Sequence, residues 1–226
     1  MYELVIANKN YSSWSMRPWV LMRALNIPFT EKLLPFHLNH GEGAIARHSP
    51  SGRVPCLIDG ELRVWDSLSI VEYLAERHPG VWPSPSADRA WARSAAAEMH
   101  SGFQALRNEC SMSVGIRVRL RSQSPALLAD LKRIETLWME GLSRHGGLFL
   151  GGSRFTAVDA FFAPVATRIQ TYGLTVASAA AAYATRLLQQ EAVREWIDAG
   201  LRELWRDAPH ERDCLANGEL IQDLRV

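Results

Sequence analysis

The sequence predicts an α/β domain followed by an all-α domain, and three observations support this prediction. Residues 1–80 alternate short β-rich apolar runs with helical segments. The segment 79–86 is rich in Pro and Ser, which is typical of a linker. Beyond it the chain is Ala-rich, and its apolar residues recur at spacings of three and four, as on amphipathic helices. We therefore expect domains at residues 1–80 and 88–226, joined by a linker at 81–87.

Turn residues delimit the expected elements of the first domain. Strands are expected at residues 2–7, 29–34, 54–58 and 62–64, and helices at 16–25 and 67–78. Asp59-Gly60 separates the last two strands, and Asp-Gly between apolar runs is a strong hairpin signal. Pro79-Gly80 ends the second helix, since proline cannot continue one.

Helical spacing of apolar residues predicts four segments in the second domain. They are a long helix from Trp91 to Cys110, a helix that opens at Ser124-Pro125 and stops at Gly146-Gly147, a helix from Ala157 to about Tyr172, and a segment around Trp196. Thr156 and Asp159 form a capping-box variant at the start of the third helix. The segment from Asp207 onward carries no pattern that predicts an element.

Composition and charge exclude several classes of protein. The 226 residues carry 25 Lys and Arg against 24 Asp and Glu, so the chain lacks the basic field of a nucleic-acid-binding protein. It has no apolar run of membrane-spanning length and no basic leader, so we expect neither membrane insertion nor export. Cys56, Cys110 and Cys214 are far apart, so we expect no disulfide framework, no metal site and a cytoplasmic location.

The first candidate for chemistry is Tyr11-Ser12-Ser13-Trp14-Ser15-Met16-Arg17-Pro18, which connects the first strand to the first helix. A helix N-terminus favours anions, because its free N–H groups and its dipole both present positive charge. Redox proteins with this element order would carry Cys-x-x-Cys here, whereas Ser-Ser-Trp-Ser supplies hydroxyl donors and no disulfide. Helix capping by these serines is the alternative interpretation, and Ser15 is the residue that we expect to act mainly as a cap.

Two further motifs follow in the first domain. In Ser51-Gly52-Arg53-Val54-Pro55, the proline begins a strand after a Gly-containing loop. This pattern fits a cis peptide bond that presents the Val54 amide to an extended ligand, although an ordinary edge-strand proline would look the same. Asp66-Ser67 open a helix whose N-terminus could anchor a carboxylate, and capping alone is again the alternative.

Taken together, these motifs resemble the glutathione S-transferase family across essentially the whole chain. The shared features are the serine loop, the Val-Pro strand with its hairpin, the acidic-Ser-x-x-Ile-x-x-Tyr-Leu pattern at 66–74, the linker and Thr156-x-x-Asp159. Zeta-like bacterial members are more similar still, since they carry Ser-Ser-Cys-Ser-x-Arg where this chain has Ser-Ser-Trp-Ser-Met-Arg. The resemblance implies a thioredoxin-like domain that binds glutathione and a helical domain that supplies most of the second-substrate pocket.

The resemblance also implies roles for individual residues. Ser12 corresponds to the serine that stabilises the glutathione thiolate, with Ser13 as the alternative. The residues implied to bind the tripeptide are His40 and Arg53 at its glycyl carboxylate, Val54 and Pro55 at its cysteinyl backbone, and Asp66 and Ser67 at its γ-glutamyl end.

The second-substrate pocket is expected to contain Trp14, His100 and Arg107. Trp14 stands where zeta-like members have cysteine, which argues against zeta-type isomerisation of maleylacetoacetate and would narrow the pocket. His100 and Arg107 share a polar face of the long expected helix and could point to the cleft between the domains, although a solvated face has the same pattern. Three arginines at 117–121 alternate with apolar residues and are interpreted as a solvent-facing segment.

The expectation is therefore a cytoplasmic, homodimeric glutathione transferase of the detoxification type. It would use reduced glutathione as co-substrate and no metal, would stabilise the thiolate with a serine, and would conjugate glutathione to a small electrophile or use it to isomerise one. A protein of the same fold that binds glutathione or a partner without turnover is the alternative.

Overall fold

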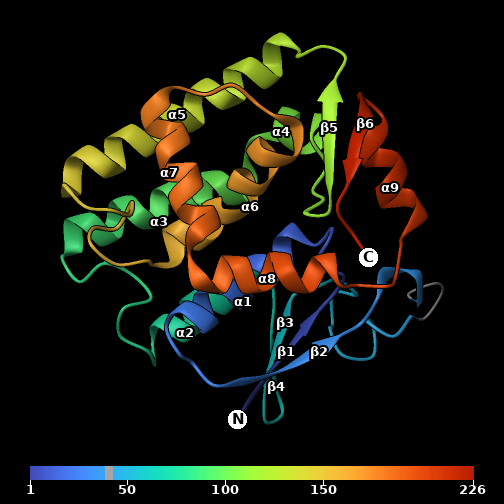
Figure 1. Cartoon of the computed structure of the whole chain (residues 1–226). Coiled ribbons are helices and arrows are strands. Elements are labelled where there is room, and N and C mark those ends of the chain that lie inside the picture. Colours follow the sequence, from blue (N-terminus) through green and yellow to red (C-terminus); the bar gives the residue numbers. More distant parts are fainter. Residues whose placement is uncertain (39–42) are drawn as a thin grey trace.

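The first domain of the computed structural model, which describes residues 1–38 and 43–226, is built on a four-stranded sheet of order β2-β1-β3-β4 (Figure 1). The strands are β1 (Tyr2–Ile6), β2 (Phe29–Leu33), β3 (Cys56–Asp59) and β4 (Leu62–Val64). β1 pairs parallel with β2 and antiparallel with β3. A parallel pair needs a crossover, and α1 (Ser13–Ala24) supplies it, followed by the short 3-10 helix η1 (Phe36–Leu38) and later by α2 (Ser67–Ala75).

The expected elements of this domain are confirmed, with one correction at the first helix. Asp59 and Gly60 form the β3–β4 turn, and Gly60 has φ +59°, a conformation that favours glycine. α1 begins at Ser13, three residues before the expected start, and Ser12 is its N-cap. The expectation that Ser15 acts as the cap was therefore wrong, because Ser15 lies inside the first turn.

The second domain is mainly helical, and Figure 1 shows it stacked against the sheet domain. Its helices are α3 (Ser86–Ser101), α4 (Gln104–Glu109), α5 (Pro125–His145), α6 (Ala157–Tyr172), α7 (Ser178–Gln189), α8 (Glu191–Leu201) and α9 (Ala208–Leu215). α6 lies at the centre of the molecule, since it packs against α1, α3 and α7. The interface between the domains is therefore a helix interface made largely by α1 and α6.

The long helix expected from Trp91 to Cys110 is in fact two helices. Gly102 is extended, and Phe103 has φ +59° in the left-handed region, so the chain breaks between α3 and α4. The break buries the Phe103 ring. At this break the Arg107 side chain supplies a hydrogen bond to the backbone, because its Nε donates to the Gly102 carbonyl oxygen at 3.0 Å.

The C-terminal segment, for which the sequence predicted no element, forms α9 and the strand β6 (Gly218–Asp223). β6 pairs antiparallel with β5 (Ile116–Leu120), which contains two of the three alternating arginines. Arg119 forms an exposed ion pair with Glu219, whereas Arg121 donates to the carbonyl oxygens of Ala216 and Gly218. The helical domain thus carries a small two-stranded sheet.

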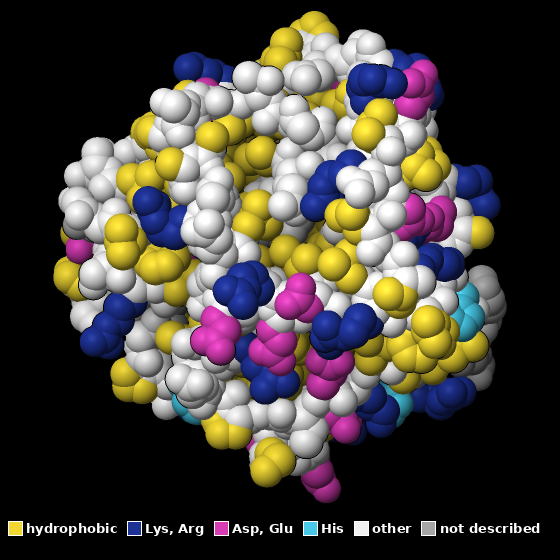
Figure 2. Space-filling view, viewed as in Figure 1, with side chains coloured by type: hydrophobic (Ala, Val, Ile, Leu, Met, Phe, Trp, Pro, Cys, Tyr) yellow, Lys and Arg dark blue, Asp and Glu magenta, His cyan; other side chains and the backbone are white. Residues whose placement is uncertain are grey.

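The capping box at α6 is confirmed. The Asp159 carboxylate is fully buried and accepts hydrogen bonds from the Leu150 and Thr156 N–H groups and from the Tyr183 hydroxyl, at 2.7 to 2.9 Å. Burial raises the pKa of Asp159 to about 6 despite these donors. The charged side chains visible on the surface in Figure 2 are of both signs and interspersed, in line with the near-zero net charge.

Candidate active site

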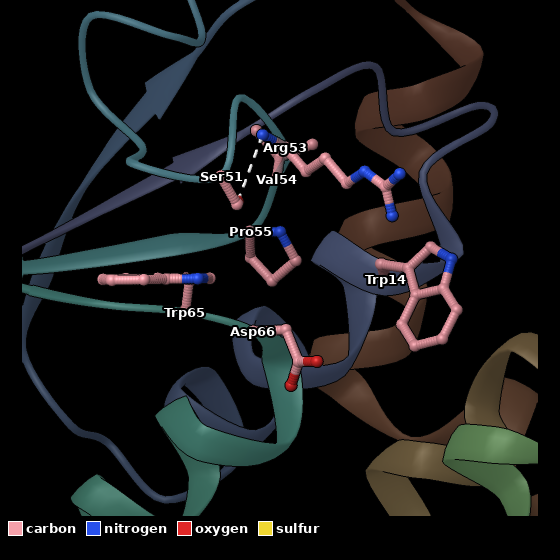
Figure 3. A pocket seen from close by; sticks show the side chains of 7 residues that line it. All are labelled: Trp14, Ser51, Arg53, Val54, Pro55, Trp65 and Asp66. Carbon is pink, nitrogen blue, oxygen red and sulfur yellow. Dashed lines mark hydrogen bonds between the residues drawn. The ribbon is translucent and has the colours of Figure 1, made fainter.

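A cavity of about 300 Å³ lies where the three sequence motifs of the first domain meet (Figure 3). Its lining residues are Trp14, Ser51, Arg53, Val54, Pro55, Trp65 and Asp66. Figure 3 shows Pro55 between Trp65 and Trp14, with Asp66 at the start of α2. The structure therefore brings together segments that lie more than fifty residues apart in the chain.

The serine turn lies at the N-terminus of α1, next to this cavity. The Ser12 hydroxyl donates to Ser15 Oγ at 2.7 Å and accepts from the Ser15 N–H at 3.4 Å. Ser12 and Ser15 thus occupy the two outer positions of a Cys-x-x-Cys motif, with a hydrogen bond in place of a disulfide. Ser13 makes no side-chain hydrogen bond to the described residues. Ser12 and Ser13 are nearly buried, and neither is part of the cavity wall.

The Val54–Pro55 peptide bond is cis, as expected, and so is the Trp65–Asp66 bond. Val54 precedes β3, and its backbone N–H and carbonyl groups make no hydrogen bond to any other described residue. Unpaired backbone groups at the end of a strand can pair with an extended ligand. Arg53 is exposed beside them, and its N–H donates to Ser51 Oγ at 3.3 Å.

The two residues that open α2 differ in accessibility. Asp66 caps the helix by accepting from the Leu68 N–H at 2.9 Å, and its side chain remains 53% exposed at the cavity. Ser67 is fully buried, and its hydroxyl has no hydrogen-bond partner among the described residues. His40, the remaining residue predicted to bind the tripeptide, lies outside the described residues.

All three residues predicted for the second-substrate pocket lie together. The Trp14 ring packs edge-on against His100 at 5.1 Å and lies 4.9 Å from the Arg107 guanidinium. His100 Nε2 lies 3.2 Å from Asp66 Oδ2 and so connects α3 to the first domain. Burial lowers the pKa of His100, Asp66 opposes this, and Arg17 and Arg107 reinforce it. His100 is therefore mainly neutral at neutral pH.

Sequence reasoning missed a role for Arg17, which is fully buried behind Trp14. Its guanidinium lies 4.2 Å from the Trp14 ring and 4.9 Å from the Phe161 ring, and none of its three nitrogens has a hydrogen-bond partner among the described residues. Burial, followed by the charges of Arg107 and Arg168, holds its pKa well below the ordinary value. The signal in the sequence was a lone arginine within the apolar face of α1.

The described residues contain no group of three or more His, Cys, Asp or Glu side chains arranged to hold a metal ion. None of their helices has the length and apolar character that crossing a membrane requires.

The structure combines parallel strands β1 and β2, a third strand preceded by proline and a serine-capped first helix, and it joins them to a helical domain. This combination defines the thioredoxin-like architecture of the two-domain glutathione-binding proteins. The N-terminal domain model of glutathione S-transferases matches residues 11–77, and the C-terminal domain model matches residues 89–199. The chain belongs to the glutathione S-transferase family.

Sequence identity to individual relatives is low. A zeta-class glutathione S-transferase from Euphorbia esula is 26% identical over 68% of this chain and 70% of its own length. A probable maleylacetoacetate isomerase from Caenorhabditis elegans is 31% identical over 43% of this chain, and the match spans less than half (46%) of that protein. A glutathione transferase homologue from Burkholderia with bound glutathione is 20% identical, with a TM-score of 0.64 over 88% of this chain and 97% of the other.

Proposed function

We propose that this protein is a glutathione transferase that binds reduced glutathione in the cavity and adds its sulfur to a small electrophile. The observation that carries the proposal is the serine turn at the N-terminus of α1, which lies beside the unpaired backbone of Val54 and the exposed carboxylate of Asp66. These three features match the thiol, the peptide backbone and the charged end of the tripeptide.

The tripeptide would lie extended along the cavity. The Val54 backbone pairs with its cysteinyl unit as an added strand, next to Pro55. Asp66 faces the γ-glutamyl ammonium group, with Ser67 at the same helix end, and Arg53 faces the glycyl carboxylate. The cysteinyl sulfur then points to the N-terminus of α1.

Thiolate formation is the step that the serine turn favours. The thiol loses its proton to solvent, and the Ser12 hydroxyl turns its own proton from Ser15 Oγ to the sulfur, while Ser15 donates to Ser12 in return. The helix N-terminus and the buried positive charge of Arg17 both favour the anion. The thiolate then forms a C–S bond with the electrophile, whose leaving group departs or whose carbanion takes a proton.

Trp14 and the residues around it select the electrophile. Trp14 from α1 meets His100 and Arg107 from the second domain, so that an aromatic ring and a cation lie next to each other at this side of the site. The cysteine of zeta-like members is absent here, so we propose conjugation rather than maleylacetoacetate isomerisation. By resemblance to the family we also propose a homodimer in the cytoplasm.

Alanine variants of the two serines test the proposal. Ser12→Ala should lower kcat by about 100-fold or more, since removing one positioned donor costs that much, and should raise the apparent pKa of the bound thiol with little change in glutathione affinity. It should also lower the unfolding free energy by about 1 kcal/mol, because it removes a cap. Ser13→Ala is the matched control and should retain turnover.

Two outcomes would contradict parts of this proposal. Loss of turnover in Ser13→Ala with normal turnover in Ser12→Ala assigns the donor to Ser13. Glutathione binding by the wild-type protein without turnover of any electrophile favours the alternative of a binding protein with this fold.

A further inference from the structure

The loop that leads into the serine turn is buried, although it connects a strand to a helix. Such loops normally run over the surface, where water satisfies their backbone groups. Residues 8–12 are each at most 6% exposed. Lys9, Asn10 and Tyr11 in this loop are contacted by the second domain, and mainly by its C-terminal part.

The backbone of Lys9 and Asn10 is bound entirely by the second domain. The Glu203 carboxylate accepts both of their N–H groups, at 2.6 and 3.3 Å. Trp196 Nε1 donates to the Lys9 carbonyl oxygen at 2.9 Å, and the Val114 N–H donates to the Asn10 carbonyl oxygen at 3.2 Å. All four backbone polar groups of this dipeptide therefore have partners in the other domain.

Tyr11 extends this connection to the C-terminal segment. Its hydroxyl donates to Glu211 in α9, and its ring stacks on His210 with centroids 5.2 Å apart. Arg225, with only 5% of its side chain exposed, donates to Glu211 Oε2 at 3.0 Å and to Asp223 Oδ1 at 2.8 Å. A phenol, a carboxylate and a guanidinium thus form one chain of hydrogen bonds.

Gly115 makes room for this arrangement. A Cβ at position 115 would lie 2.4 Å from Arg225 side-chain carbons and 2.7 Å from Asn10 Oδ1. The Leu224 N–H also donates to the Gly115 carbonyl oxygen at 2.8 Å. The close approach of Arg225 to the loop therefore depends on the absence of a side chain at Gly115. Figure 1 shows α9 and β6 beside β5 at this edge of the molecule.

We propose that the C-terminal segment 203–226 positions the serine turn for catalysis. Glu211 and Arg225 of this segment act through Tyr11 of the loop, and these three are the positioning residues. The proposal rests on the proposed function, since Ser12 must meet the glutathione sulfur for its position to matter. Ser12 directly follows Tyr11, so any shift of the tyrosine moves the serine. A misplacement of about 1 Å can reduce a rate by about 100-fold.

Tyr11→Phe is the direct test, because it removes only the hydroxyl and keeps the ring on His210. We expect kcat to fall by about tenfold or more and the pKa of the bound thiol to rise. The KM for glutathione should change less than about twofold, because Val54 and Asp66 hold the tripeptide elsewhere. Glu211→Gln should act in the same direction, and the double variant should lose little more than Tyr11→Phe alone, as expected for residues in one chain.

Arg119→Gln is the matched control. It breaks an exposed ion pair on the same β5–β6 sheet and should leave kcat and the thiol pKa at their wild-type values. A Tyr11→Phe protein with a lower melting temperature but unchanged kcat and thiol pKa would overturn the proposal, because the contact would then be structural only.

The ultraviolet absorption of the bound thiolate separates this proposal from the proposed function. A thiolate signal in the wild-type protein that is identical in Tyr11→Phe overturns the positioning role alone. Absence of a thiolate signal in the wild-type protein overturns both proposals. A wild-type signal that Tyr11→Phe shifts to higher pH supports the positioning role.

Discussion

At the scale of single residues, Arg17 is the least expected feature of the site. A buried guanidinium without hydrogen bonds is costly, and the rings of Trp14 and Phe161 compensate only part of that cost. Among the described residues, Asp66 is the acidic side chain that opposes the lowering of its pKa. We propose that the positive charge of Arg17, in the first turns of α1, favours the thiolate of bound glutathione, which would give this cost a functional reason.

We therefore predict that Arg17→Met raises the pKa of the bound glutathione thiol and does not lower the unfolding free energy. The methionine fills a similar volume and removes the desolvated charge, and replacing buried charges with apolar groups is often neutral or stabilising, by about 1–4 kcal/mol. Urea unfolding and a pH titration of the bound thiol measure the two effects.

Arg168→Met is the control for this prediction. Arg168 is also buried, but it donates to the carbonyl oxygens of Cys110 and Pro164 at 2.8 and 3.1 Å. Its replacement removes the side-chain donor of the Cys110 carbonyl oxygen, whereas the Pro164 carbonyl oxygen keeps the Thr167 hydroxyl at 2.9 Å. Arg168→Met should therefore destabilise the protein by about 1–3 kcal/mol. Strong destabilisation by Arg17→Met, with an unchanged thiol pKa, would show that Arg17 is a structural residue.

At the scale of elements, the sequence predicted correctly those turns and helix starts that depend on neighbouring residues alone. The Asp59-Gly60 hairpin and the Thr156–Asp159 capping box are set by residues within a few positions of one another, and both were predicted correctly. The break at Phe103 depends on burial of its ring between distant segments. The β6 strand depends on pairing with β5, about one hundred residues earlier. Such partners leave no periodic pattern in the sequence.

The C-terminal strand gives a prediction for pH. The hydrogen bond from Arg225 lowers the pKa of Asp223. For Glu211, burial raises the pKa, but the hydrogen bonds from Arg225 and Tyr11 outweigh it, and the net pKa is lowered. Carboxylates with lowered pKa values stabilise the folded state above their unfolded pKa of about 4 and lose that contribution as the pH falls through the folded pKa.

Arg225→Met should therefore lower the unfolding free energy at pH 7, and by less at pH 3. Urea denaturation of both proteins at the two pH values measures the difference. A destabilisation that is equal at pH 7 and pH 3 would mean that Arg225 acts through packing of its alkyl chain and not through its two carboxylate partners.

At the scale of the whole molecule, the two-domain architecture followed from the change in composition near residue 80 and from the order of three motifs. The residues around Trp14 were harder to predict, because they meet across the interface of α1, α3 and α6. His100 and Arg107 were predicted from a shared helix face, whereas Arg17 entered only as the last residue of the Ser-Ser-Trp-Ser-Met-Arg motif and was given no role of its own. Burial and missing hydrogen-bond partners depend on the folded arrangement, so the sequence could not reveal that the Arg17 guanidinium is buried without a partner among the described residues.

Calorimetric titration of the wild-type protein with reduced glutathione tests the central claim most directly, when it is repeated in two buffers of different ionisation enthalpy. A free thiol has a pKa of about 8.5, so a site that favours the thiolate must release a proton on binding near neutral pH. We predict saturable binding at one site per chain, with a heat that differs between the buffers. S-methylglutathione, which has no thiol proton, should bind with the same heat in both. Absence of saturable heat at millimolar glutathione would contradict the account.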